Sequence, residues 1–124
     1  MKRRAFRSSE RDKMKKRVND GYTFAAVSYG EGSTTTNFEQ SDHFWMFYLK
    51  DGKVWKKELL SFFPKNNEER ITAIENSVID VIICRNFGPK SMAALKKKRI
   101  LLYTYDGGCN AAVRDLLAGE LHEL

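Results

Sequence analysis

Three side chains in this sequence combine a soft donor atom with a position at the end of a predicted element. Cys84 ends an apolar run, His43 begins a β-forming run, and Cys109 follows two glycines at the predicted start of a helix. Backbone N–H groups and the helix dipole lower the pKa of a thiol at a helix start, which favours a metal-binding thiolate. Cys109, Cys84 and His43 are therefore the candidate metal ligands. Cysteine is also a common small buried hydrophobe, so a structural role for both thiols stays open.

Glycine-bearing turns supply a second kind of chemistry, which is backbone hydrogen bonding to an anion. The first turn is Arg85-Asn86-Phe87-Gly88-Pro89, and the second is Asp106-Gly107-Gly108-Cys109. Glycine lets a bulky anionic ligand approach backbone N–H groups closely, and a helix start favours negative charge. The candidate cofactor-binding residues are Arg85, Asn86, Phe87, Gly88, Gly107 and Gly108. The alternative is that these glycines only turn the chain.

The charged side chains do not form a recognisable catalytic arrangement. Acid–base catalysis needs two groups within reach of one substrate, and a two-metal centre needs several carboxylates on neighbouring strands. Asp106 is near the second turn, whereas Asp80 opens its predicted strand and so falls at the opposite edge of the sheet. The sequence therefore predicts a protein without enzymatic activity.

Short apolar runs alternate with helical patterns, which is typical of parallel strands joined by helices. Asp51-Gly52 is a preferred hairpin turn. This hairpin extends the sheet in one direction from strand 1, and two right-handed crossovers extend it in the other. The prediction is an α/β fold with three helices and a mixed five-stranded sheet, in the order 3-2-1-4-5 with strand 2 antiparallel. The predicted strands are Tyr22–Tyr29, His43–Lys50, Lys53–Phe63, Val78–Cys84 and Ile100–Tyr105, and the helices begin near Asn66, Pro89 and Cys109.

This strand order places a topological switch between strands 1 and 4. In open α/β sheets, ligands bind beyond the carboxyl ends of the strands at such a switch. Both glycine turns fall at that edge of the sheet, and so do both cysteines. We therefore expect a binding crevice between Gly30–Thr36 and Arg85–Pro89.

The positive charge of the chain is confined to its first residues. Residues 1–20 contain nine of the 22 Lys and Arg residues and three of the 16 Asp and Glu residues, so residues 21–124 contain 13 of each. We expect a basic, flexible extension over residues 1–20 and one domain over residues 21–124. A neutral domain argues against a dedicated nucleic-acid surface. No apolar stretch reaches the roughly 20 residues of a membrane span, and two cysteines suit a reducing compartment, so we expect a cytoplasmic protein.

Several motifs follow one another in a particular order. Gly88-Pro89 opens a helix that carries Ala93-Ala94-Leu95, a Lys-rich end follows, and Gly107-Gly108 precedes a helix that ends Leu117-Ala118-Gly119-Glu120-Leu121. On these motifs, the segment Asp80–Leu121 resembles the dinitrogenase iron-molybdenum cofactor biosynthesis family, small nitrogenase-accessory proteins with a ribonuclease H-like fold. The segment Asn37–Phe44 looks like the His-Phe-Gly-Arg-Ala segment of that family. The resemblance covers about 100 residues, from Tyr22 onward.

The resemblance implies a non-catalytic carrier for an iron-molybdenum cofactor, a related metal-sulfur cluster or its precursor, with cluster-assembly proteins as partners. Asn37 stands where the family usually has histidine, and Glu39 stands where it has glycine. Asparagine is a poor ligand for soft metals. One alternative is a protein-interaction or regulatory module that has lost the cofactor and uses the strand Lys53–Phe63 or the basic extension. A hydrolase of nucleic acid or phosphoester rests on fold analogy alone.

Overall fold

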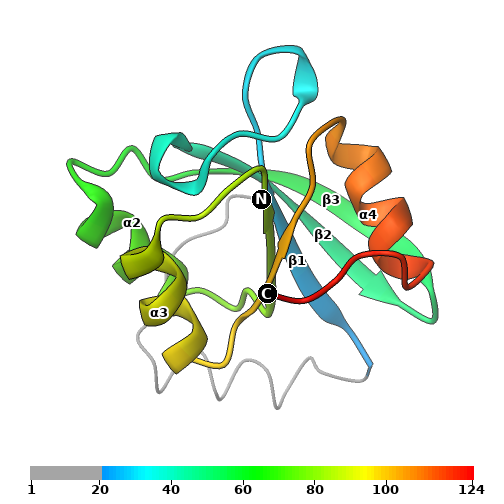
Figure 1. The fold of residues 1–124 in the computed structure, drawn as a ribbon. Helices are drawn as coiled ribbons and strands as arrows, with labels where there is room; N and C mark the ends of the chain where they lie inside the picture. The colour runs from blue at the N-terminus through cyan, green and yellow to red at the C-terminus, as the bar shows by residue number, and fades with distance from the viewer. Residues whose placement is uncertain (1–20) are drawn as a thin grey trace.

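A computed structural model describes residues 21–124, and the extension predicted over residues 1–20 lies outside them. A five-stranded sheet forms the middle layer, in the order β3-β2-β1-β4-β5 (Figure 1). β1, β4 and β5 run parallel, whereas β2 is antiparallel to β1 and β3. The predicted fold class and strand order are thus confirmed. The strands are β1 (Thr23–Ser28), β2 (His43–Lys50), β3 (Lys53–Ser61), β4 (Val81–Cys84) and β5 (Leu101–Thr104).

Helices cover both faces of the sheet, with α2 and α3 on one face and α4 on the other (Figure 1). They are α2 (Asn67–Glu75), α3 (Pro89–Lys97) and α4 (Cys109–Leu117), and two 3-10 turns, η1 (Glu31–Ser33) and η2 (Phe38–Gln40), lie between β1 and β2. The Asn66 side chain caps α2 by accepting a hydrogen bond from Glu69 N–H at 2.9 Å. Among residues 21–124, no helix combines the length and apolar character that crossing a membrane requires.

Alternating side chains of the central strands build two hydrophobic cores, one on each face of the sheet. In β1, Ala26 packs on the side of α2 and α3, whereas Ala25 and Val27 pack on the side of α4. All four residues of β4 are buried, as expected for a parallel strand that is covered on both faces. This double burial fixes the carboxyl ends of β1, β4 and β5 relative to one another.

The strand β4 begins at Val81, not at Val78 as predicted. The chain first turns after α2, because the Ser77 hydroxyl donates to Ile74 O at 2.6 Å and accepts from Ile79 N–H at 3.2 Å. Val78 is therefore buried in this turn and not in the strand. Its apolar character placed it in the predicted strand, but a serine hydroxyl that bonds locally to the backbone can end a helix and delay the strand.

The two edge strands differ in what lies beside them. At β5, Leu124 N–H donates to Leu102 O at 2.9 Å, and Glu123 forms an antiparallel bridge with Tyr103. The C-terminal residues therefore cover this edge. At β3, no further strand pairs with the outer edge within the described part of the chain.

Candidate functional site at the carboxyl edge of the sheet

The two glycine turns meet at one rim, beyond the carboxyl ends of β4 and β5. The segment Thr34–Glu39 crosses this rim and contacts both turns. Thr35 N–H donates to Gly107 O at 2.8 Å, and Phe38 N–H donates to Asn86 O at 2.9 Å. The prediction that both turns lie at one edge of the sheet is therefore confirmed.

The predicted open crevice between Gly30–Thr36 and Arg85–Pro89 is not present. Its position is filled by the chain itself, because Arg85 N–H donates to Thr36 O at 2.8 Å and Asn37 forms a parallel bridge with Asn86. The backbone groups that emerge beyond β4 need hydrogen-bond partners, and the connection between β1 and β2 supplies them.

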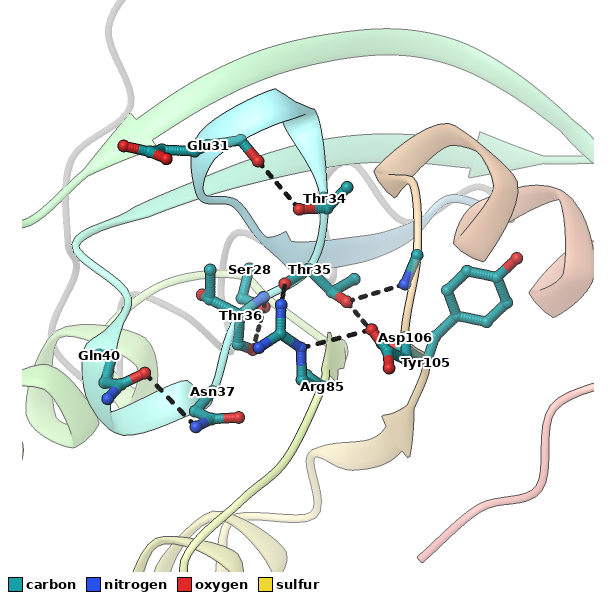
Figure 2. A network of polar contacts seen from close by, with 11 residues as sticks. Ser28, Glu31, Thr34, Thr35, Thr36, Asn37, Gln40, Arg85, Tyr105 and Asp106 are labelled. Carbon is teal, nitrogen blue, oxygen red and sulfur yellow. Dashed lines mark hydrogen bonds and ion pairs between the residues drawn. The ribbon is translucent and has the colours of Figure 1, made fainter.

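Thr35 joins the two halves of the rim (Figure 2). Its buried hydroxyl donates to Tyr105 O at 2.6 Å and accepts from Gly107 N–H at 3.3 Å. Its carbonyl accepts from the Arg85 guanidinium at 2.9 Å. The same guanidinium lies 3.4 Å from an Asp106 carboxylate oxygen, and Asp106 is exposed. Arg85 is therefore held at the solvent side of the rim, where it is paired with Asp106.

The Glu39 carboxylate occupies the turn at the start of α3. It accepts from Gly88 N–H at 2.7 Å and from the Ser91 hydroxyl at 2.5 Å. A helix start attracts negative charge because its first N–H groups are unpaired and the helix dipole is positive there. A Cβ added at Gly88 would lie 2.8 Å from a Glu39 carboxylate oxygen, so glycine is needed for this approach. The Gly88 turn thus fits an anion, and the chain supplies one.

A buried arginine anchors this arrangement from α2. Arg70 donates to Asn67 Oδ1 at 3.0 Å and to Ser41 O at 2.7 Å, and it lies 3.3 Å from an Asp42 carboxylate oxygen. Asn67 in turn donates to the Ser91 hydroxyl at 2.7 Å. Two helices and the segment after Glu39 are therefore joined by one polar network, in which the buried guanidinium is paired and hydrogen-bonded.

The other end of the rim is the Gly107–Gly108 turn, where Thr34 forms an isolated antiparallel bridge with Gly108. Gly108 caps α4, and a Cβ added there would meet nothing within 4 Å. Gly107 has a φ of +155°, and a Cβ there would lie 3.0 Å from the Tyr105 ring. The chain thus needs glycine at position 107 for its backbone conformation, whereas position 108 has free space beside the start of a helix.

The two cysteines lie on opposite faces of the sheet. Cys84 packs in the core beside α2 and α3, and Cys109 packs in the core beside α4, with its thiol 3.4 Å from Ser28 O. Both side chains are buried. Burial raises the pKa of each thiol, because a thiolate loses its solvation in the core. The lowered pKa expected for Cys109 from its helix start is therefore wrong, because burial raises the pKa by more than the nearby Lys57 ammonium lowers it.

His43 lies at the rim end of β2, but it has a partner of its own. Its Nδ1 atom lies 2.7 Å from the Ser61 hydroxyl. Its ring is perpendicular to the Phe63 ring, with 5.4 Å between the two ring centres. No group of three or more His, Cys, Asp or Glu side chains within residues 21–124 is arranged to hold a metal ion. The candidate ligands Cys84, Cys109 and His43 are therefore not brought together in one coordination site.

Four residues of this site were not found from the sequence: Thr35, Glu39, Arg70 and Ser91. Thr35 bonds to Tyr105 across 70 positions, and Glu39 bonds to Gly88 across 49. No local pattern carries such pairings. The one available signal was Glu39 itself, a carboxylate at a position where the resembling family has glycine.

Comparison with known proteins shows the fold. No protein-family model matches the sequence, and no curated protein matches it. Among solved structures, a protein described as a candidate dinitrogenase from Methanocaldococcus jannaschii has 17% sequence identity and a TM-score of 0.67, with 83% of this chain and 95% of that chain covered.

Two further solved structures share the fold at similar identity. One is a candidate NifB protein of the DUF35 family from Thermotoga, with 18% identity, a TM-score of 0.64, and coverage of 82% of this chain and 93% of that one. The other is the apo form of the orange protein from Desulfovibrio gigas, with 18% identity, a TM-score of 0.66, and coverage of 82% and 92%. The chain thus shares the fold of these three proteins.

The Glu39 contact predicts a specific stability effect. We expect Glu39→Gln to lower the free energy of unfolding by about 1–2 kcal/mol, because hydrogen bonds to a charged group contribute about 1.5–3 kcal/mol. Urea unfolding followed by circular dichroism measures the change. Glu31→Gln is the matched control, since Glu31 is exposed in the same connection and should change the value by less than about 0.5 kcal/mol. Equal effects of the two substitutions would contradict the assigned role of Glu39.

The burial of both thiols predicts slow modification. We expect Cys84 and Cys109 to react with a disulfide reagent at pH 8 at least about a hundredfold more slowly than a cysteine placed at the exposed position 93 by Ala93→Cys, because thiolates react and buried thiols stay protonated. Mass spectrometry of digested samples gives the rate at each site. A native thiol that reacts as fast as the one at position 93 would show that it reaches solvent.

The raised thiol pKa values also predict a loss of stability at alkaline pH. Below about pH 8.5 the Cys84 thiol is protonated in both states, and above it the thiol ionises in the unfolded chain while burial keeps it protonated in the folded chain. Each pH unit above that point should lower the free energy of unfolding by about 1.4 kcal/mol through Cys84, and the raised pKa of Cys109 acts in the same direction. We expect a smaller fall from pH 7 to pH 9.5 in Cys84→Ala than in the wild type, as measured by urea unfolding. An equal fall in the free energy of unfolding of the two proteins would contradict the assignment of the pH effect to Cys84.

Proposed function

We propose that this protein is a non-catalytic binding protein that holds an anionic metal-sulfur cluster, of the iron-molybdenum or a related type, or its precursor. The observation that carries the proposal is the rim itself, where two glycine-bearing helix starts meet beyond the carboxyl ends of parallel strands. The bound Glu39 carboxylate supports it, because it occupies one of these starts as an anionic ligand would.

The Gly108 end of the rim is the proposed seat of the cargo. The Gly108 backbone at the start of α4 donates to the anion, whereas the Gly107 N–H is already bonded to Thr35. The Arg85 guanidinium supplies positive charge from the opposite turn. Thr35 holds the Gly107 turn and the Arg85 side chain together. These residues bind and orient a guest, and no acid–base pair is part of the arrangement.

The donor set fits an anion better than it fits thiolate ligation. Cys84 and Cys109 face different cores, and burial raises the pKa of both thiols. We therefore propose that charge and amide donors hold the cargo, without a cysteine ligand. The nitrogenase-related descriptions of the solved structures support a link to metal-cluster metabolism, and cluster-assembly proteins are the proposed partners.

A second candidate is a protein-interaction or regulatory module of the same fold that no longer binds a cofactor. Glu39 favours this candidate, because a carboxylate of the chain fills the turn at Gly88. The two candidates differ in one measurable property, which is whether the protein takes up metal.

Charge at position 108 tests the proposed seat. Asp and Asn are both preferred at the residue that caps a helix, and a Cβ meets nothing there, so Gly108→Asp and Gly108→Asn should both fold. We expect the Asn variant to load iron and molybdenum like the wild type after purification without oxygen. The Asp variant should retain less than about a tenth, because like charges placed together cost several kcal/mol. Elemental analysis and visible absorption measure the loading.

Two further results decide between the readings of the site. Cys109→Ala should load as the wild type does if amides hold the cargo, whereas loss of loading would make the buried thiol a ligand and contradict the amide seat. Absence of metal in anaerobically prepared wild-type protein, also after incubation with iron, molybdate and sulfide, would leave the interaction module as the function.

A further inference from the structure

Exposed apolar side chains gather along one edge of the sheet. The β3 edge, which we define as residues Lys53–Phe63, carries four of the six large hydrophobic side chains that are exposed among the described residues. Trp55 is 58% exposed and Phe63 is 69% exposed, and Val54 and Leu59 are exposed as well. Such a concentration on a small neutral domain marks an interaction site.

Within residues 21–124, no strand pairs with the outer backbone of β3. β3 is the last strand of the sheet on its side, whereas residues 123 and 124 cover β5 on the other side. An uncovered edge strand presents a row of N–H and C=O groups, which is a template for an added strand. The pairing with β2 shifts register between Tyr48 and Leu49, and it is regular from Lys56 to Ser61. The regular part is the place where an extended chain can add.

The charge of β3 indicates the chemistry of the partner. Lys53, Lys56 and Lys57 lie on β3 with one acidic residue, Glu58, although residues 21–124 as a whole contain equal numbers of acidic and basic residues. Pairing of β3 with a second copy of itself brings these lysines together, and like charges across strands are destabilising. The edge is therefore complementary to an acidic chain.

The side-chain pattern of β3 places one cation beside an apolar surface. Lys57 and Leu59 project to the face of the sheet that α4 covers, since they pair with Phe47 and Trp45 of β2. The Lys57 ammonium is fixed there, 3.0 Å from Asn110 Oδ1 and 4.3 Å from the centre of the Trp45 ring. An ammonium held in place loses less side-chain entropy on binding than a mobile one.

We propose that the β3 edge binds an extended acidic segment of a partner protein, which adds to the sheet as a sixth strand. On the α4 side, an acidic side chain of this segment lies opposite Lys57 and an apolar side chain lies against Leu59. The backbone pairs with the outer groups of residues 56–61. This inference does not depend on the cargo at the rim, because the β3 edge lies beyond β2 and contains none of the proposed cargo-binding residues.

A synthetic peptide tests the proposal with the full chain. The probe is a ten-residue peptide with a fluorescent label in which glutamate and valine take turns along one face and threonine fills every second position (Glu-Thr-Val-Thr repeats), because successive side chains of a strand point to opposite faces. Fluorescence anisotropy gives its Kd. We expect Lys57→Glu to weaken binding roughly tenfold or more, because a desolvated charge pair is replaced by repulsion. Lys97→Glu, an exposed position on α3, is the matched control and should leave the Kd within about twofold. Should Lys57→Glu not fold, Leu59→Asp at the exposed neighbouring position serves the same purpose.

A second peptide separates strand addition from simple charge attraction, because residues 1–20 are basic as well. The same peptide with alternate backbone nitrogens methylated keeps its charge but cannot form the backbone hydrogen bonds of an added strand. We expect it to bind at least about tenfold more weakly. We also expect the outer amides of residues 56–61 to gain hydrogen-exchange protection with the unmodified peptide. Equal affinity of the two peptides, an unchanged Kd in Lys57→Glu, or a dimer formed through β3 in sedimentation would each overturn the proposal.

Discussion

Backbone groups that emerge beyond the ends of β4 and β5 need hydrogen-bond partners, and the organisation of the site depends on how they are paired. The connection between β1 and β2 meets this need, with Thr35 bonded to the Gly107 turn and Phe38 bonded to Asn86. Parallel strands usually leave this edge as a crevice. Here the edge is crossed by the chain, and the space that remains beside the rim lies next to Gly108.

The closed half of the rim shows how charge is balanced inside a small domain. The Arg70 guanidinium is buried, and its partners come from α2 and from the segment that carries Glu39. A buried charge is tolerated only when it is paired and hydrogen-bonded. The Glu39 carboxylate lies at the opposite end of the same network, on the start of α3. Two opposite charges therefore hold the helices and the rim in one arrangement.

The sequence was informative where local chemistry decides the structure. The bounds of β2, the Asp51-Gly52 turn, the strand order and the meeting of both glycine turns were predicted correctly. The face of the sheet on which Cys84 lies was not predictable, because β4 is apolar throughout and lacks an alternation that distinguishes its faces. The filling of the crevice was also missed, since it rests on pairs of residues 49 and 70 positions apart. Such pairings follow from the closed fold, and a single sequence does not encode them locally.

The strand-like cover that Leu124 and Glu123 place on β5 has a consequence for assembly. A sheet that accepts a neighbour along both borders grows without limit, as fibrils do. Among residues 21–124, residues 123 and 124 already pair with β5, so that border is occupied and β3 is the border without a paired strand. A neighbouring sheet that approached β5 would first have to displace this pairing.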